Sequence, residues 1–189
     1  MMHAPAHPTL LMLAGLPGTG KSTLAAELAR RLGWPVIDKD LLNTVLLQAA
    51  LTQAQAGRLA YELALTLAHA LVVQQKRSLI LDTAGRQPFI AERARMIAQE
   101  AGGQLKVVRC IAPFAVRQAR LRARQAGPSQ WTHDQTTLDQ ETAWYAHLPA
   151  DTLIVSSDQP LEDLIAIVMP LVQAQVREQY SGHLTSQAQ

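Results

Sequence analysis

Residues 9–40 read TLLMLAGLPGTGKSTLAAELARRLGWPVIDKD, and this stretch decides the fold. The apolar run Thr9–Ala14 is short and is followed by glycine, which is typical of a buried parallel strand. Apolar residues recur at helical spacing from Gly20 to Leu32, just before another glycine. Val36-Ile37 then predicts a second short strand. A strand, a helix and a second strand therefore follow one another within about thirty residues, the length of a typical βαβ unit.

The loop between the first strand and the first helix carries a phosphate-binding pattern. Residues 15–22 read GLPGTGKS and match G-x-x-x-x-G-K-[ST] in the strand-to-helix context that this pattern requires. Glycines let successive backbone N–H groups turn toward phosphate oxygens, and the N-terminus of the following helix adds positive potential. We therefore predict that ATP binds to Gly15, Leu16, Pro17, Gly18, Thr19, Gly20, Lys21, Ser22 and Thr23.

Three side chains of this loop have distinct predicted roles. Lys21 can reach the β- and γ-phosphates, and the Ser22 hydroxyl can ligate Mg²⁺. Thr23 is expected near the α-phosphate. The alternative is a glycine-rich turn that binds nothing, which the coincidence of motif, strand and helix disfavours. ATP and Mg²⁺ are therefore the expected cofactors, with Lys21 also contributing to catalysis.

Carboxylates follow the second and third predicted strands, at the sheet edge where open α/β folds bind ligands. Asp40 can accept a proton from a hydroxyl that attacks the γ-phosphate, or it can serve as N-cap of a helix beginning at Leu41. Asp38 is a candidate ligand of a Mg²⁺-bound water or a second base. Asp82 is expected either in the metal site or as the cap of a turn. Ser22, Asp38 and Asp82 are the predicted metal residues.

A basic helix is predicted after the fourth strand. Arg117, Arg120 and Arg124 recur at spacings of three and four and share one face. Guanidinium groups suit the charge of a transferring phosphoryl group, although the same spacing is common on a solvated face. Gly127-Pro128 predicts a break soon afterwards. We expect a mobile flap over about 114–145, in which Arg120 and Arg124 are catalytic and Arg120 also contacts ATP.

Alternating strand and helix patterns continue to the end of the chain. The predicted elements are a helix over 41–75 with a break near Ala56-Gly57, a strand over 78–82, a helix over 88–101, a strand over 105–111, a helix over 113–124, a strand over 152–155 and a helix over 161–178 interrupted at Pro170. This alternation predicts an α/β fold of three layers, with five parallel strands in the order 2-3-1-4-5. Residues 1–8 are expected to form a flexible leader, 9–178 one domain, and 179–189 a flexible tail.

The composition fits one globular domain and excludes several classes of protein. Of the 189 residues, 48% are hydrophobic and 17% are charged, with a net charge of +2 that indicates no extended nucleic-acid track. The single cysteine, Cys110, excludes an internal disulfide framework and predicts a buried strand thiol. No apolar run approaches the ~18 residues of a membrane span. We expect a cytoplasmic protein with no membrane partner.

The stretch LAGLPGTGKSTLAAELARRLGWPVIDKD, with Leu81-Asp82-Thr83 and the arginine stripe before Gly127-Pro128-Ser129, resembles the small P-loop kinases that phosphorylate hydroxyl groups. That group includes gluconate-kinase-like enzymes, chloramphenicol phosphotransferase, zeta-toxin-type kinases and the kinase domain of polynucleotide kinase. The resemblance covers roughly residues 9–158. It implies a P-loop NTPase fold with a helical lid, arginines that close over ATP, and Asp40 as the catalytic base. It also suggests that Asp158 and Pro160 lie near adenine.

The expected function is ATP- and Mg²⁺-dependent transfer of the γ-phosphate to a hydroxyl of a small or nucleotide-like molecule. A nucleotide-hydrolysing switch and a non-catalytic nucleotide-binding module are the alternatives, and a nucleic-acid acceptor is not favoured. The related kinases often have an Asn soon after the third-strand Asp, whereas this chain has Ala84-Gly85-Arg86. Aromatic and histidine residues near the lid form either an acceptor pocket or packing: Trp131, His133, Trp144, Tyr145 and His147.

Overall fold

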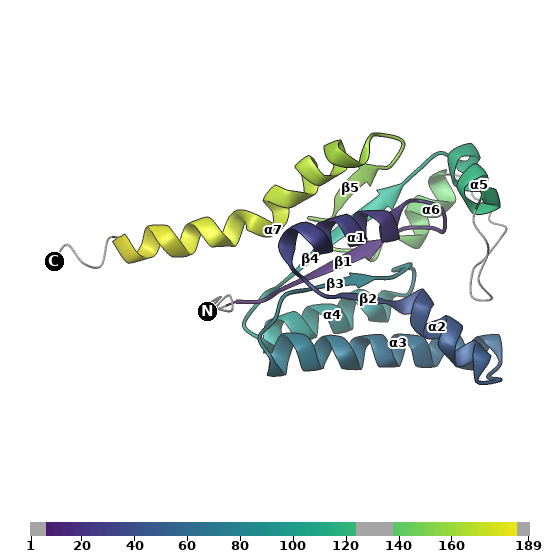
Figure 1. Cartoon of the computed structure of the whole chain (residues 1–189), viewed down its shortest axis with the longest axis horizontal. Helices are drawn as coiled ribbons and strands as arrows, with labels where there is room; N and C mark the ends of the chain where they lie inside the picture. The colour runs from purple at the N-terminus through teal and green to yellow at the C-terminus, as the bar shows by residue number, and fades with distance from the viewer. Residues whose placement is uncertain (1–6, 124–137, 185–189) are drawn as a thin grey trace.

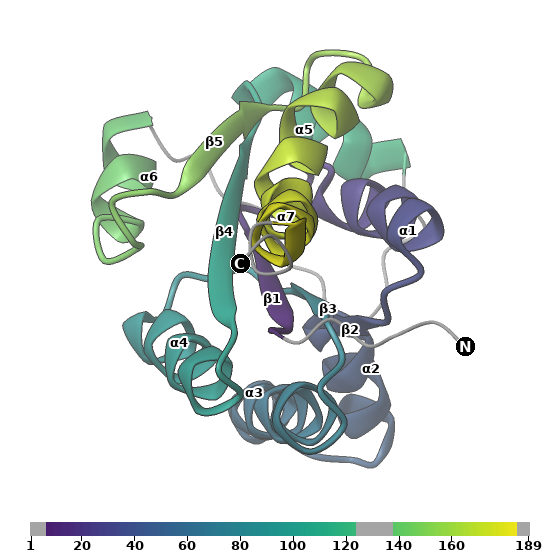
Figure 2. The same ribbon diagram turned by 90° about the vertical axis from the view of Figure 1, so that its left-hand side faces the viewer.

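The computed structural model of the chain describes residues 7–123 and 138–184. At its centre lies a parallel sheet of five strands in the order β2-β3-β1-β4-β5 (Figures 1 and 2). These strands are β2 (Val36–Asp38), β3 (Leu79–Asp82), β1 (Thr9–Ala14), β4 (Gln104–Ile111) and β5 (Leu153–Ser156). The α/β class, the parallel arrangement and the strand order are those predicted from the sequence.

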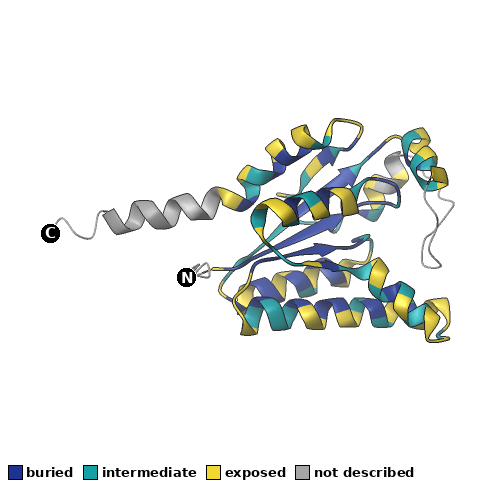
Figure 3. Cartoon of the chain, in the orientation of Figure 1, coloured by how far each residue is buried: buried dark blue, intermediate teal, exposed yellow. Residues whose placement is uncertain are grey.

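The central strand β1 is buried along its whole length (Figure 3). It pairs with β3 on one side, where Leu13 lies opposite Asp82, and with β4 on the other, where Ala14 lies opposite Arg109. Because β1 is central, the loop that follows Ala14 emerges in the middle of the carboxyl edge of the sheet. Side chains at the ends of β2, β3, β4 and β5 can therefore approach this loop.

Alternate residues of β1 point into two separate hydrophobic cores. Leu10 and Met12 belong to the core beneath α3 (Gln53–His69) and α4 (Pro88–Glu100). Leu11 and Leu13 belong to the core beneath α1 (Lys21–Leu32) and α7 (Leu161–Leu184). The three layers of the fold follow from this alternation, with helices on both faces of the sheet (Figure 2).

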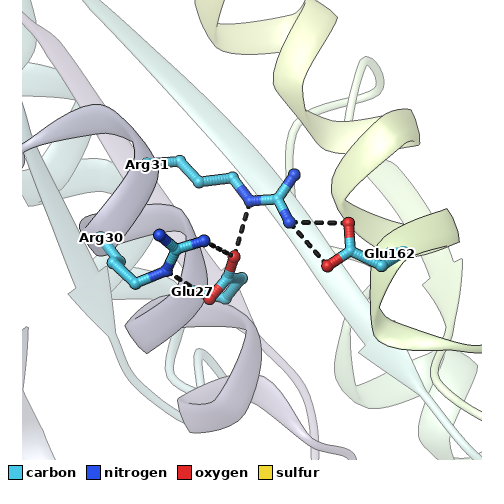
Figure 4. Close-up of polar contacts among 4 residues, drawn as sticks. All are labelled: Glu27, Arg30, Arg31 and Glu162. Atoms are coloured by element: carbon cyan, nitrogen blue, oxygen red, sulfur yellow. Dashed lines mark hydrogen bonds and ion pairs between the residues drawn. The ribbon is translucent and has the colours of Figure 1, made fainter.

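An ion-pair network joins α1 to α7 on the surface (Figure 4). Glu27 accepts hydrogen bonds from Arg30 and Arg31 of its own helix, and Arg31 Nη2 lies 2.6 Å from a carboxylate oxygen of Glu162 on α7. The hydrogen bonds from Arg30 and Arg31 lower the pKa of Glu27 to about 2. The network therefore favours the ionised carboxylate and fixes the two helices of this layer side by side.

The predicted break near Ala56-Gly57 is wrong, because both residues lie within α3. The helices separate earlier, between α2 (Lys39–Gln48) and α3, where Ala50 has a positive φ of 61°. Thr52 caps α3: its side chain accepts from the Gln55 backbone N–H, and the Gln55 side chain accepts from the Thr52 backbone N–H. This capping box stops α3 from extending further back, whereas a single glycine inside a helix is tolerated.

Helix α3 continues into the single-turn π-helix η1 (Ala70–Gln74). Among the residues that the structure describes, Gln53–Gln74 is the one helix long and apolar enough to cross a membrane, by length and composition only. One stripe of this helix is buried in the core: Ala56, Ala60, Ala64, Leu65, Ala68 and Val72. The small residues of this stripe let the helix approach the sheet and α4 closely.

Helix α7 runs through Pro170 without interruption, in contrast to the prediction. Proline removes the N–H that would bond to the carbonyl four residues earlier, at Ala166. Both Ala166 and Pro170 are exposed, so water can bond to that carbonyl. The lost hydrogen bond therefore does not leave a buried polar group.

Residues near both ends of the described chain make contacts or extend elements. His7 Nδ1 lies 2.7 Å from the Gly102 carbonyl, and the Pro8 carbonyl accepts from the Gln104 N–H at 3.1 Å. At the other end α7 extends to Leu184, past the predicted limit of 178, and projects beyond the sheet (Figure 1). The contacts of His7 and Pro8 come from the turn before β4, which is distant in the sequence.

Two short helices lie in the region of the expected flap, α5 (Phe114–Ala123) and α6 (Leu138–Trp144). Residues 124–137 between them are outside the described part of the chain, and so are Arg124, Trp131 and His133. Helix α5 was predicted, whereas α6 was not.

Candidate active site

The loop after β1 is closed by hydrogen bonds to its own backbone and to the neighbouring loop. The carbonyl of Leu16 accepts from Thr19 Oγ1 at 2.7 Å, from the Thr19 N–H at 3.3 Å and from Lys21 Nζ at 3.0 Å. The Gly15 N–H donates to the Ala84 carbonyl at 3.1 Å. These bonds give the loop a defined shape before any phosphate binds.

Two glycines of the loop are required by their surroundings. Gly15 has φ +139°, and a Cβ there would collide with the backbone carbonyl of Cys110 on β4. Gly18 has φ +81°, and a Cβ there would lie 2.8 Å from the backbone carbonyl of Arg117 on α5. The loop therefore packs directly against β4 and α5, and only glycine fits these two positions without strain.

The N-terminus of α1 is built for an anion. Its N-cap is Gly20, which has no side chain to accept from the first backbone N–H groups, and its first turn has no acidic residue. Instead the first residue is Lys21, a cation at the positive end of the helix. This arrangement is unfavourable for the helix alone but suits a bound phosphate, which interacts with the N–H groups, the dipole and the lysine together.

Asp82 lies beside this helix terminus, at the end of β3. Its residue is 4% exposed, and Asp38 of β2 lies opposite in the register of the sheet. Burial raises the pKa of the Asp82 carboxyl, nearby Lys21 and a hydrogen bond from Ser22 lower it, and Asp38 and Asp40 raise it. The Asp82 side chain therefore contacts the phosphate loop through Ser22.

Ser22 and Asp82 fit a Mg²⁺ site in which the protein supplies one or two oxygen ligands and bound phosphates supply others. Mg²⁺ prefers oxygen ligands and is usually held by one or two protein groups together with phosphates and water. The buried Asp82 carboxyl is close to two other carboxylates, so a divalent cation would offset their mutual repulsion. Within residues 7–123 and 138–184 no group of three or more His, Cys, Asp or Glu side chains could hold a metal alone.

The N-cap of α2 is Asp38, not Asp40. Asp38 Oδ1 accepts from the backbone N–H of Asp40 at 2.8 Å and of Leu41 at 3.2 Å, so α2 begins at Lys39. The expected alternative, Asp40 as cap of a helix from Leu41, is therefore wrong. Asp40 lies in the first turn, where its half-exposed carboxylate is 3.0 Å from Lys39 Nζ.

A cleft of about 420 Å³ brings the phosphate loop and Asp40 together. The loop side is formed by Pro17, Gly18, Gly20, Lys21 and Ser22. The opposite side is formed by Asp38, Lys39, Asp40 and Asn43 of β2 and α2, by Gln53, Gly57 and Tyr61 of α3, by Ala84, Arg86 and Gln87 of the β3–α4 loop, and by Leu121 of α5. A molecule other than the one bound by the phosphate loop can therefore lie between that loop and α3, within reach of Asp40.

The segment after α6 holds the β3–α4 loop in place through hydrogen bonds to its backbone. Tyr145 Oη donates to the Ala84 carbonyl at 2.9 Å, and His147 Nε2 lies 3.1 Å from the Gly85 carbonyl. Tyr145 is itself buried, and it does not line the cleft. Of the two roles that the sequence left open for these residues, the structure shows packing.

Trp144 has a related contact. The Arg86 guanidinium lies 3.9 Å from the centre of the Trp144 ring, and Arg86 also lines the cleft. Stacking on an aromatic ring fixes the plane of a guanidinium group. Trp144 therefore orients a residue that lines the cleft.

Arg120 lies between the phosphate loop and the loop after β5. Its guanidinium donates to Ser157 Oγ at 2.9 Å, to the Ser157 carbonyl at 2.6 Å and to the Gly18 carbonyl at 3.3 Å. It lines a second cleft of about 420 Å³ with Gly18, Gly20, Thr23, Ala123, Ser157, Gln159, Leu161 and Leu164. Asp158 and Pro160, which the resemblance suggests lie near adenine, do not line this cleft, whereas their neighbours Ser157 and Gln159 do.

Arg109 and Asn43 are among the buried polar residues to which the sequence analysis gave no role. Arg109 on β4 is 6% exposed and lies 4.4 Å from the centre of the Tyr145 ring; its Nε and Nη2 have no hydrogen-bond partner among the described residues. Asn43 on α2 is 1% exposed. A basic residue between Val108 and Cys110 of an apolar strand was a usable signal for Arg109. The sequence held no such signal for Asn43, because its burial depends on how α2 packs against α3.

A parallel sheet with a G-x-x-x-x-G-K-S loop after its central strand defines a P-loop nucleotide-binding fold. A family profile described as an AAA domain (AAA_33) matches residues 10–148, and the chain belongs to this family. No curated protein sequence matches the chain significantly.

Solved structures of small kinases share this fold. A candidate kinase from Chloroflexus aurantiacus is 23% identical with a TM-score of 0.66, over 86% of this chain and 97% of that one. A gluconokinase from Sinorhizobium meliloti is 17% identical with a TM-score of 0.59, over 93% and 97%. An APS kinase from Mycobacterium tuberculosis, in complex with AMPPNP and APS, is 20% identical with a TM-score of 0.58, over 88% and 98%. The chain thus has the fold of the small P-loop kinases, as the resemblance implied.

Proposed function

We propose that this protein transfers the γ-phosphate of ATP, in the presence of Mg²⁺, to a hydroxyl group of a small molecule. One observation carries the proposal: Lys21 and Asp40, separated in the sequence by a helix and a strand, line one cleft. Phosphoryl transfer needs the phosphates of a nucleotide and an acceptor held in line, and this cleft places the phosphate loop and Asp40 around one space. The names of the structural neighbours, gluconokinase and APS kinase among them, support the same class of reaction.

The phosphate loop and Lys21 bind the nucleotide in this proposal. Backbone N–H groups of residues 15–23 surround the phosphates, and Lys21 Nζ exchanges its bond to the Leu16 carbonyl for phosphate oxygens. Arg120, already joined to Gly18 and Ser157, stabilises negative charge from the other side. Arg124 keeps its predicted role in the flap, although it lies outside the described residues.

Ser22 and Asp82 would hold the metal ion, with Asp38 as a further ligand through water. Asp38 Oδ1 is engaged as the cap of α2, so only its other oxygen is available for that purpose. When bound, Mg²⁺ neutralises charge on the phosphates.

Asp40 accepts the proton of the acceptor hydroxyl. As this O–H bond breaks, the oxygen forms a bond to the γ-phosphorus, and the bond between phosphorus and the β–γ bridging oxygen breaks to release ADP. Lys39, 3.0 Å away, helps to hold the Asp40 carboxylate in position. General-base assistance of this kind contributes typically ~100- to 10,000-fold in rate.

A nucleotide-hydrolysing switch is the second candidate, and the cleft disfavours it. A hydrolase needs only a water molecule beside the γ-phosphate, whereas here the cleft extends past Asp40 to Gln53 and Tyr61 of α3. That extension fits an acceptor of several heavy atoms. We expect the reaction to take place in the cytoplasm, where ATP is supplied.

An acceptor screen tests the proposal. The protein is incubated with γ-labelled ATP, Mg²⁺ and separate pools of sugars, nucleosides, antibiotics and oligonucleotides with a free 5′-hydroxyl. We expect label on a small molecule in at least one pool. Release of labelled inorganic phosphate at one rate in every pool would favour hydrolysis and overturn the proposal.

A further inference from the structure

A buried amide lies beside the proposed base. Asn43 follows Asp40 by three residues on α2, lines the same cleft and is 1% exposed. Its Oδ1 has no hydrogen-bond partner within the part of the chain that the structure describes. Residues three apart on a helix share one face, with about 5–6 Å between their Cβ atoms, so Asp40 and Asn43 point to neighbouring parts of the cleft.

An unsatisfied buried amide oxygen is unusual in a native protein. The large majority of buried polar side-chain atoms have a partner, and leaving one without a partner destabilises the fold. A leucine at position 43 would fill nearly the same space without this cost. The oxygen can only accept, so a ligand that carries a donor group into the cleft would supply its missing partner.

We infer that Asn43 binds a second hydroxyl of the acceptor, next to the hydroxyl that Asp40 deprotonates. This inference rests on the proposed transfer to an alcohol, and it narrows the acceptor to polyhydroxylated molecules. Sugars, sugar acids and the ribose of nucleosides share this chemistry. Asn43 is then a residue that determines specificity, because an alcohol without the second hydroxyl leaves its amide unpaired.

The rest of this part of the cleft is also suited to a polyhydroxylated ligand. Gln53 and Gln87 offer both donors and acceptors. The Tyr61 ring is fixed on two sides, with Lys39 Nζ 4.8 Å from its centre and the Phe89 ring 5.8 Å away in an edge-to-face contact. A rigid aromatic surface with polar groups around it binds the apolar face of a sugar while its hydroxyls make hydrogen bonds.

Matched pairs of acceptors test this inference. Label transfer from ATP is measured for D-ribose and deoxyribose, uridine and deoxyuridine, gluconate and its deoxy analogues, and glycerol and propanediol. The variants are Asn43→Leu, with Asn43→Ala as a smaller replacement should leucine prevent folding. Gln48→Leu is the control, since Gln48 is an exposed amide on the same helix that does not line the cleft.

We expect the parent protein to favour the hydroxylated member of the pair that it accepts, by about 10- to 100-fold in kcat/KM. Asn43→Leu should reduce this ratio of kcat/KM values to within about threefold. The change should come mainly from the kcat/KM for the hydroxylated acceptor, with the KM for ATP unchanged. Gln48→Leu should keep the parent ratio.

Different results identify which statement fails. Equal transfer to both members of each pair by the parent would overturn the role of Asn43 and leave the kinase proposal intact. No transfer to any of these acceptors, with transfer to another class in the wider screen, would overturn the inference alone. No transfer in the wider screen either would overturn both. A lower melting temperature of Asn43→Leu together with an unchanged ratio would assign Asn43 to the fold alone and overturn the inference.

Discussion

The two halves of the candidate site are built in different ways. The nucleotide half is one continuous segment, residues 15–23, whose shape depends on backbone hydrogen bonds such as those to the Leu16 carbonyl. The acceptor half combines side chains from α2, α3 and the β3–α4 loop, among them Asp40, Tyr61 and Arg86. A backbone cradle binds a phosphate that is common to all nucleotides, whereas side chains can vary to suit one acceptor without altering the fold.

The Ala84 carbonyl joins the two halves. The Ala84 carbonyl accepts from the Gly15 N–H of the phosphate loop and from Tyr145 Oη, so the acceptor loop is tied to both the nucleotide half and the segment after α6. A substitution in one half should therefore leave the function of the other half unchanged, except at Ala84, the junction of the two halves.

The largest expected effect is on the acceptor half alone. We expect Asp40→Asn to slow phosphoryl transfer by about 100- to 10,000-fold, since the amide cannot accept the proton. ATP affinity should be preserved, and stability should change by at most about 1 kcal/mol, because the pair with Lys39 is exposed at Asp40. Label transfer and an ATP titration measure the two effects.

A matched control is Asp151→Asn, which changes an exposed carboxylate away from both clefts. Normal transfer by a stable Asp40→Asn protein would contradict the assignment and move the search for the base to Asp38 or Asp82.

The next effect concerns the nucleotide half. We expect Lys21→Ala to lower turnover by about 100- to 1000-fold, because a cation aimed at the transferring phosphate is lost. Lys21 Nζ donates to the Leu16 carbonyl, and losing this hydrogen bond should leave the melting temperature within a few degrees of the parent. Thermal melting with and without Mg-ATP provides the measurement. Equal stabilisation by nucleotide and equal turnover in both proteins would count against the phosphate-loop assignment.

A smaller effect is expected at the junction. Tyr145→Phe removes the hydrogen bond to the Ala84 carbonyl but keeps the bond from Gly15 and the ring beneath Arg109. The free energy of unfolding should fall by about 0.5–1.5 kcal/mol, with a loss of transfer well below that of Asp40→Asn. Urea unfolding gives the first value. An unchanged free energy would mean that the hydroxyl does not anchor the loop.

The smallest effect belongs to neither half. Glu27 lies in the surface network between α1 and α7, and its hydrogen bonds lower its folded-state pKa from 4.5 to about 2. The stabilisation from a depressed carboxyl pKa is present above the unfolded value and is lost as pH falls through the folded value. Glu27→Gln should therefore melt at a lower temperature than the parent at pH 7, and this difference should shrink as pH falls below about 4 and disappear only below about pH 2. Transfer at neutral pH should be unchanged. A difference in melting temperature that does not vary with pH would contradict this explanation.

Local patterns predicted the strands and most helices because each depends on residues close in the sequence. The prediction of a break near Ala56-Gly57 was wrong for a local reason as well. Thr52 and Gln55 form a capping box that starts the helix before these residues, and the helix tolerates one glycine in its interior. The same applies at α2, where Asp38 rather than Asp40 has the extended backbone and the side-chain acceptor of an N-cap.

The amino-acid sequence was sufficient to predict the glycine-rich loop between the first strand and the first helix, and the order of the strands, because a continuous motif and strict alternation of strand and helix leave few arrangements. The residues of the acceptor half could be identified only from the folded structure. Asn43 becomes buried, Arg86 is oriented by Trp144, and Tyr145 contacts Ala84 through the packing of segments up to about sixty residues apart. No periodicity in a single helix or strand encodes such contacts, since they arise when separate helices and loops pack against the same edge of the sheet.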